Sequence, residues 1–493
     1  MDFRADRSLP AGGMPVPAGE RLGALTTRRT GEKSEMKAAC ICMGRRVMVL
    51  PVTLLVAAVA LGGEGSPPAE KYRDVVDVGG LSLKEAVAIA LENNHDLKLA
   101  EIATAQAAWE TDRARSLFLP QISGTAAYDV RDKEKEVGFG PQTVAVGEKE
   151  FMRAELTARM TVWDFGRTLG AYRGAAKAAE AARYALKRVR QEVIYRTCMA
   201  YFRVLTARRL KQAAEAAVRS AQAHLKDAEV LLKNGAVTER DVLRARANLE
   251  EQRHRLVEAR NALRLAEMSF NDVLGREVSL PVRLREETGG LQADYGGSAT
   301  GALEVAVSNR PEFQQMAALV AAAEGRRTAA RGEFLPRIYV AGSLTHLDDR
   351  YQVHKTEALG EVGLQYDLFT GGRHLAELRI AGLEVNRALE QADKVADAVA
   401  LQVREALLAA ETAAARLKAA SNTLASAEEN RRLVHAQYRQ GAASSTDVID
   451  AEMLWVRAQA DYWWAEYERR TAQARILYAL GTIDAVLAKE EEP

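Results

Sequence analysis

The sequence predicts a mostly α-helical fold with a smaller β part, built from two equivalent halves. The motif Phe-Leu-Pro at residues 118–120 recurs at 334–336, and the pair Gly-Ala at 235–236 recurs at 441–442. Apolar residues return every three or four positions over very long stretches, and they alternate with polar residues in four shorter stretches. Such a duplication indicates two structurally equivalent units, and the two periodicities indicate long helices joined to short strands.

Residues 1–62 are expected to be an over-called N-terminus followed by a signal peptide. Two arginines precede an apolar run at 47–61, and small residues close it, which is the order typical of a secretory signal. Met36 or Met43 is the expected start. A transmembrane anchor is the alternative, although about 15 apolar residues fall short of the roughly 20 that span a bilayer.

The first half, residues 63–275, is expected to begin with helices and to continue into a β-hairpin at about 119–163. Pro120 ends the preceding helix, and even-numbered strand residues are apolar while odd-numbered ones are polar. Ten to twelve residues at about 3.3 Å each cross a bilayer when tilted. A helical hairpin at about 168–274 follows; its first helix, of roughly 65 residues, spans about 100 Å, and its return helix keeps coiled-coil heptads.

The second half repeats this order after a glycine-containing linker at 276–300. It covers residues 301–481, with a β-hairpin at about 336–368 and a long helical hairpin at about 373–480. Residues 482–493 are expected to form a C-terminal tail.

The four strands require partners beyond their own half. The same alternation is typical of a soluble sheet with one buried face, so alternation alone does not place them in a membrane. Each half supplies only two strands, however, and an isolated hairpin is barely stable in water. Four strands cannot close a barrel, because the smallest known barrels have about eight. If the strands cross a membrane, several chains must share one barrel.

Three duplicated motifs carry a family resemblance over residues 80–481. They are the Phe-Leu-Pro before each strand pair, the Trp-Asp-Phe-Gly at 163–166 matched by residues 366–373, and the glycines followed six residues later by Asp-Val. In this order they resemble the TolC-like outer-membrane efflux family, the outer membrane factors. The resemblance implies a homotrimer in the outer-membrane lipid, with one twelve-stranded β-barrel continuing into an α-helical barrel in the periplasm. It also implies docking on a periplasmic adaptor and an inner-membrane transporter of RND, ABC or MFS type.

Polar residues gather where the long helices turn. Thr238 and Asp241, and likewise Ser444 and Asp447, have the spacing of a capping box, a purely structural role. Capping does not explain Asp450, which lies one turn further along the same helix face as Asp447. In a symmetric assembly these two carboxylates would form rings that attract cations and repel anions.

The resemblance assigns further roles at these turns. It implies that Asp447 and Asp450 form an entrance gate, and that a hydrogen bond between Asp241 and Tyr438 holds the gate shut. The gate arginine of the family is absent, because Ala443 occupies its position, so how the gate is held shut stays open. The turns at Gly235 and Gly441 would be the periplasmic tips at which an adaptor docks, and glycine allows their sharp backbone turn.

No enzyme is predicted. The seven histidines lack metal-ligand spacing, and no glycine-rich phosphate loop lies between a strand and a helix. Neither a catalytic site, a metal nor a cofactor is therefore expected. A formal net charge of +1 also predicts no nucleic-acid partner.

Together these features predict a passive outer-membrane exit duct of a tripartite efflux or type I secretion system, gated at its periplasmic tip. The alternative is a periplasmic coiled-coil adaptor, although an adaptor normally carries one hairpin flanked by small β-domains. The sequence leaves open the cargo, whether drugs, metals, siderophores or protein, and the identity of adaptor and pump.

Overall fold

The computed structural model of the protein describes residues 80–286 and 298–484. The predicted signal peptide lies outside the described residues, as do part of the linker and most of the C-terminal tail. None of the described helices carries an apolar stretch long enough to cross a bilayer.

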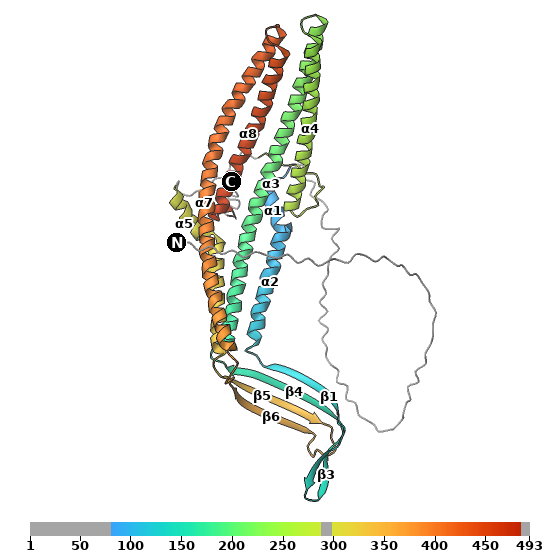
Figure 1. Cartoon of the computed structure of the whole chain (residues 1–493), viewed down its shortest axis with the longest axis vertical. Helices are drawn as coiled ribbons and strands as arrows, with labels where there is room; N and C mark the ends of the chain where they lie inside the picture. The colour runs from blue at the N-terminus through green and yellow to red at the C-terminus, as the bar shows by residue number, and fades with distance from the viewer. Residues whose placement is uncertain (1–79, 287–297, 485–493) are drawn as a thin grey trace, which may run out of the picture. The chain divides into compact units, whose positions relative to one another are not determined.

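The described ranges contain eight helices and six strands (Figure 1). In the first half they are α1 (Leu83–Asn93), α2 (His95–Ser116), β1 (Gln121–Val130), β2 (Lys135–Phe139), β3 (Gln142–Gly147), β4 (Glu150–Trp163), α3 (Arg167–Lys233) and α4 (Glu239–Val273). In the second half they are α5 (Ala299–Asn309), α6 (Pro311–Gly332), β5 (Arg337–Leu347), β6 (Thr356–Gln365), α7 (Arg373–Arg439) and α8 (Ser445–Leu480). The predicted mostly helical fold with a small β part is confirmed.

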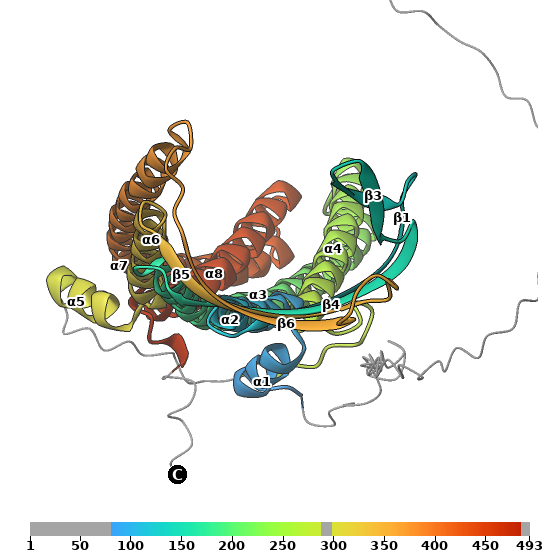
Figure 2. The ribbon, with the colours of Figure 1, turned by 90° about the horizontal axis from the view of Figure 1, so that it is seen from below.

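Four strands form one antiparallel sheet in the order β1-β4-β5-β6, so the hairpins of the two halves join through β4 and β5. The sheet is curved (Figure 2). The separate β2–β3 hairpin is not among the predicted strands. Its sequence is short and contains three glycines between 135 and 147, which gives a weak periodic signal.

The strand register places the apolar residues of all four strands on one face. Leu156, for example, pairs with Gly124 on one side and with Leu344 on the other, so even-numbered residues share a face up to the irregularity at which Trp163 pairs with Ile338. This apolar face is exposed. Its exposed members include Ile122, Tyr128, Met152, Leu156, Met160, Val340, Leu344, Val362 and Leu364.

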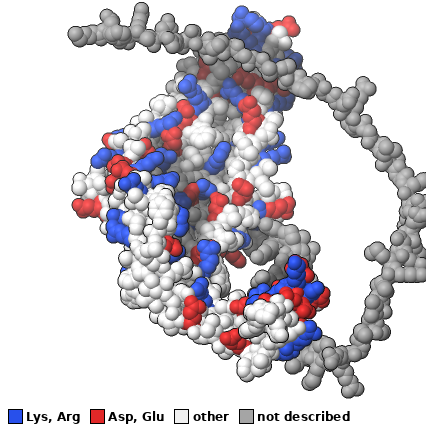
Figure 3. Space-filling model, turned by 60° about the horizontal axis from the view of Figure 1, so that its bottom comes forward, with Lys and Arg blue, Asp and Glu red and all other residues white. Residues whose placement is uncertain are grey.

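The opposite face of the sheet is polar. The Arg159 guanidinium lies 4.0 Å from the ring centre of Tyr339, whose hydroxyl donates to Glu361. Beyond the sheet, the connecting loops carry ion pairs between Arg350 and Glu148 and between Lys355 and Asp348. Charged side chains gather in that region in Figure 3, next to largely uncharged surface.

The two halves also join through a close crossing of α3 and α6. A Cβ added at Gly325 would lie only 2.6 Å from the Gly174 nitrogen, and one added at Gly170 would lie 2.6 Å from the Ala329 nitrogen. The glycines therefore let the two backbones approach closely, because any side chain would hold them apart.

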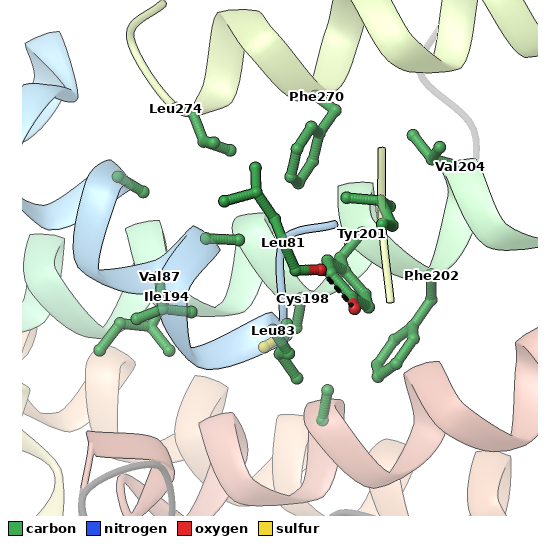
Figure 4. Close-up of a cluster of buried hydrophobic side chains, with 14 of the residues drawn as sticks. Leu81, Leu83, Val87, Ile194, Cys198, Tyr201, Phe202, Val204, Phe270 and Leu274 are labelled. Atoms are coloured by element: carbon green, nitrogen blue, oxygen red, sulfur yellow. Dashed lines mark hydrogen bonds between the residues drawn. The ribbon is translucent and has the colours of Figure 1, made fainter. Parts of the chain in front are cut away.

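The largest buried cluster lies where α1, α3 and α4 meet the C-terminal part of α8 (Figure 4). Tyr201 of α3 is fully buried there and donates its hydroxyl to the Leu81 carbonyl oxygen at 3.1 Å. Cys198, one turn earlier, is also fully buried in this cluster. This core fixes the base of the first helical hairpin, from which α3 continues to the turn at Gly235.

Candidate functional site at the hairpin tips

The ends of the two helical hairpins are built alike. α3 and α7 each have 67 residues, and each is followed by a glycine in the left-handed region, Gly235 at φ 71° and Gly441 at φ 77°. No atom lies within 4 Å of a Cβ built on either glycine. Their requirement for glycine is thus conformational, and the surface around both turns is open.

Capping boxes follow both turns. The backbone N–H and hydroxyl of Thr238 donate to the Asp241 carboxylate at 3.0 and 2.7 Å. Ser444 donates in the same way to Asp447 at 2.7 and 2.8 Å. These hydrogen bonds lower the pKa of both carboxyl groups below the ordinary value, so both are ionised at neutral pH.

The structure does not form the predicted hydrogen bond between Asp241 and Tyr438. The capping box engages the Asp241 carboxylate, and the Tyr438 hydroxyl, in a residue only 2% exposed, has no hydrogen-bond partner. Burial raises the pKa of Tyr438, and the negative charge of Asp241 raises it further. Asp241 and Tyr438 are therefore close enough to interact electrostatically, although no hydrogen bond joins them.

Asp447 and Asp450 are both exposed on the first turns of α8. Asp450 makes no ion pair with the described residues. Nearby, Arg244 of α4 donates to the Thr446 hydroxyl at 2.7 Å, so the tips of the two hairpins touch within one chain. Ala443, at the position of the missing arginine, cannot supply such a contact.

A buried polar cluster just behind the tips was not predicted. His224 and Ser220 of α3 meet Ser445 and Glu452 of α8 and His435 of α7. Helical spacing alone could not reveal it, because 228 residues separate His224 from Glu452 along the chain (452 − 224). Within the part of the chain that is described, no group of three or more His, Cys, Asp or Glu is arranged to hold a metal.

Comparison with known proteins agrees with this architecture. The chain is similar to the outer membrane efflux protein BepC of Brucella suis biovar 1, with 25% identity over 376 residues, 76% of this chain and 79% of BepC. It is also similar to the alkaline protease secretion protein AprF of Pseudomonas aeruginosa, with 24% identity over 306 residues, 60% of this chain and 62% of AprF.

The fold matches solved outer-membrane channels. The CmeC channel of Campylobacter jejuni superposes with a TM-score of 0.71 at 21% identity, covering 81% of this chain and 85% of CmeC. The relatives are channel proteins rather than enzymes. The outer membrane efflux protein model matches residues 86–276 and 302–482, one match on each half. The chain therefore belongs to the outer membrane efflux protein family and serves as an outer-membrane exit duct with a periplasmic helical tunnel, not as a periplasmic adaptor.

Proposed function

We propose that three copies of this chain close one conduit, that its periplasmic tip is the gate, and that an adaptor and an inner-membrane transporter dock there. The observation that carries the proposal is the exposed apolar face of the four-stranded sheet. Exposing such an apolar face to water is unfavourable, whereas the same face packs favourably against lipid.

The sheet edges support the sharing of strands between copies. Among the strands of residues 80–286 and 298–484, β1 pairs only with β4, and β6 pairs only with β5. Unpaired edges are templates for further strands. Since the order is antiparallel throughout, β6 of one copy can pair with β1 of the next in the same sense. Three copies with four strands each would then give one closed sheet of twelve.

The exposed apolar faces of two helices support the same arrangement. α6 packs on α3 within one chain, whereas their repeat equivalents, α2 and α7, expose apolar stripes. The stripes consist of Leu99, Ile102 and Trp109 on α2, and of Ile380 and Leu383 on α7.

The internal repeat predicts how these stripes meet. Gly325 of α6 lies against Gly174 of α3. The repeat offset of 216 residues places Trp109 at the position of Gly325, and the offset of 206 places Ile380 at the position of Gly174. Trp109 is 74% exposed and Ile380 57% exposed in one chain. We therefore infer that Trp109 of one copy packs against Ile380 of the next.

The gate is proposed to involve the acidic residues at the tips. In a trimer, Asp447 and Asp450 would each contribute a ring of three carboxylates that favours cations. Tyr438 is poised behind them with an unpaired hydroxyl, and Asp241 lies close enough for its charge to act on that phenol. A small rotation of the helices could exchange the capping bond of Asp241 for one with Tyr438. The exposed turns at Gly235 and Gly441 would then be the docking points for an adaptor.

The gate is tested with the double variant Asp241→Ala, Tyr438→Phe in planar bilayers. We expect a higher conductance of the purified protein than for wild type. The matched control is Asp461→Ala, which removes an exposed aspartate from the middle of α8 and should leave conductance unchanged. Unchanged conductance in the double variant would remove both residues from the gate.

The choice of cargo is proposed to depend on the inner-membrane transporter. BepC is named for efflux and AprF for secretion of a protease, so relatives of similar identity serve different cargoes. We propose that the inner-membrane transporter selects the cargo and that the duct contributes only its diameter and lumen charge.

A further inference from the structure

The polar cluster behind the tips bridges the two helical hairpins. His224 Nε2 of α3 is hydrogen-bonded to Ser445 Oγ of α8 at 3.1 Å. Ser220 of α3 donates to Glu452 Oε1 at 2.6 Å, and His435 of α7 donates to the same oxygen at 2.5 Å. Two side chains of the first hairpin thus bond to two side chains of α8, and α7 bonds to one of these as well.

This cluster is buried yet titratable. His224 is 2% exposed and Glu452 6% exposed, and His224 Nδ1 has no hydrogen-bond partner. Burial raises the pKa of Glu452, but hydrogen bonds from His435 and Ser220 outweigh that effect and lower it, so the carboxylate stays ionised. The charged or titratable groups that face His224 are Asp227 on α3, His435, Arg431 and Tyr438 on α7, and Glu452 on α8, with Asp241 of α4 beyond Tyr438.

The internal repeat places a different pair of residues in the first hairpin at the positions of His435 and Glu452. At the repeat offset of 206 residues, His435 and Glu452 correspond to Glu229 and Arg246. These two form an ion pair at 3.7 Å between α3 and α4. The first hairpin therefore has a glutamate–arginine ion pair at the positions where the second has a histidine hydrogen-bonded to a glutamate.

We propose that His224, hydrogen-bonded to Ser445 beside the Glu452 carboxylate, forms a proton-operated latch that joins the two hairpins near the tip and opens it in acid. The proposal rests on the gate proposed above. The resemblance implies a gate arginine at the position of Ala443. The latch would hold the closed state without that arginine.

The direction of the pH effect depends on whether His224 binds its proton more tightly in the closed state or in the separated state. Burial lowers the pKa of His224, the nearby His435 lowers it further, and Glu452 and Asp227 act in the opposite direction. Once the hairpins separate, His224 meets water, and its pKa returns to about 6.5. The separated state thus binds more protons, so falling pH through about 6.5 favours it.

Charge balance in the cluster points the same way. At neutral pH, the Glu452 carboxylate faces the Arg431 guanidinium at 3.7 Å and a hydrogen bond from His435. In acid, a protonated His224 would add a second cation to a buried cluster whose one carboxylate already faces Arg431. A low local dielectric makes such an additional buried cation costly.

The test uses the full-length protein with spin labels at Ala236→Cys and Ala442→Cys, both exposed at the tips. Cys40→Ser and Cys42→Ser remove the two N-terminal thiols, and Cys198 is fully buried, so labelling is confined to the tips. Tip-to-tip distances and bilayer conductance are measured from about pH 7.5 to about pH 5.5. We expect the population with separated tips to rise about threefold or more in wild type, since each unit of pKa difference between the states shifts the equilibrium up to tenfold.

His224→Gln keeps a hydrogen-bonding side chain near Ser445 but cannot take up the proton, so its tip distances should vary much less with pH. The control is His254→Gln, the same substitution at a 73% exposed side chain on α4, which should retain the wild-type response. Ser445→Ala provides a second variant, expected to separate the tips already at neutral pH. Melting temperatures verify that each variant is folded.

Two outcomes separate the latch from the gate. Tip distances that do not change with pH in wild type, or that change equally in wild type and His224→Gln, would overturn the latch whatever the conductance. Tip distances that respond as expected while conductance stays constant would support the latch and instead refute the proposal that the tip is the gate.

Discussion

The glycine crossing of α3 and α6 gives a sharp prediction about stability. Gly325→Ala adds one methyl group, and its carbon would lie 2.6 Å from the nitrogen and 2.7 Å from the Cα of Gly174. Both are backbone atoms, so no side chain can turn aside and the two helices must move apart. The crossing joins the first half of the chain to the second, so the displacement affects both.

The magnitude follows from two opposing effects. Overpacking a close contact costs about 1–3 kcal/mol, and a backbone contact belongs at the upper end of that range. Replacing glycine by alanine inside a helix recovers about 1 kcal/mol. We therefore expect Gly325→Ala to lower the free energy of unfolding by about 2 kcal/mol.

Gly382→Ala on α7 is the matched control. No atom lies within 4 Å of a Cβ built at Gly382, so only the gain in helix propensity remains, and stability should rise slightly or stay unchanged. Thermal unfolding of both variants is followed by far-UV circular dichroism in detergent. Equal melting temperatures for the two variants would refute the close crossing of α3 and α6.

Three further predictions follow from the same structure. Trp109→Glu should weaken association between copies, because it places a charge in the proposed contact with Ile380. Analytical ultracentrifugation in detergent measures the oligomeric state, with Leu265→Glu, at an exposed position of α4, as the control. An unchanged oligomer in Trp109→Glu would contradict the inferred contact. Asp447→Ala with Asp450→Ala should weaken block of the conductance by multivalent cations, whereas equal block would leave Asp447 a capping residue only. Tyr201→Phe should destabilise the protein by about 1 kcal/mol, because it removes a buried hydroxyl that donates to the Leu81 carbonyl, which still accepts from the Arg285 N–H. A denaturation midpoint equal to that of wild type would show that this hydrogen bond contributes nothing to stability.

Local patterns predicted much of the fold because their causes are local. Strict alternation around Leu156 or Val340 fixes which side chains share a face, whatever the neighbouring strand is. Heptads along the long helices fix their seams. The turns at Gly235 and Gly441 required a left-handed residue, and both positions adopt positive φ. Capping boxes after the turns are equally local, and both formed.

Contacts between segments far apart in the sequence were not predicted correctly. The pairing of Asp241 with Tyr438 is not formed, and the Asp241 carboxylate instead accepts from Thr238, three residues away. The α3–α6 crossing and the latch around Glu452 were not predicted at all, since they combine residues from both halves. Glycine in a helix and histidine in a coiled coil have no distinctive local pattern.

The sequence by itself determined the duplication, the long helical hairpins, the amphipathic strands and the tip turns, because each depends on contacts within a few residues or on a fixed period. Only the tertiary structure decided which strand of one half pairs with the other, how closely α3 and α6 approach, and that His224 lies beside His435 and Glu452. Those arrangements depend on side-chain packing between segments more than a hundred residues apart, and no period along the chain encodes them.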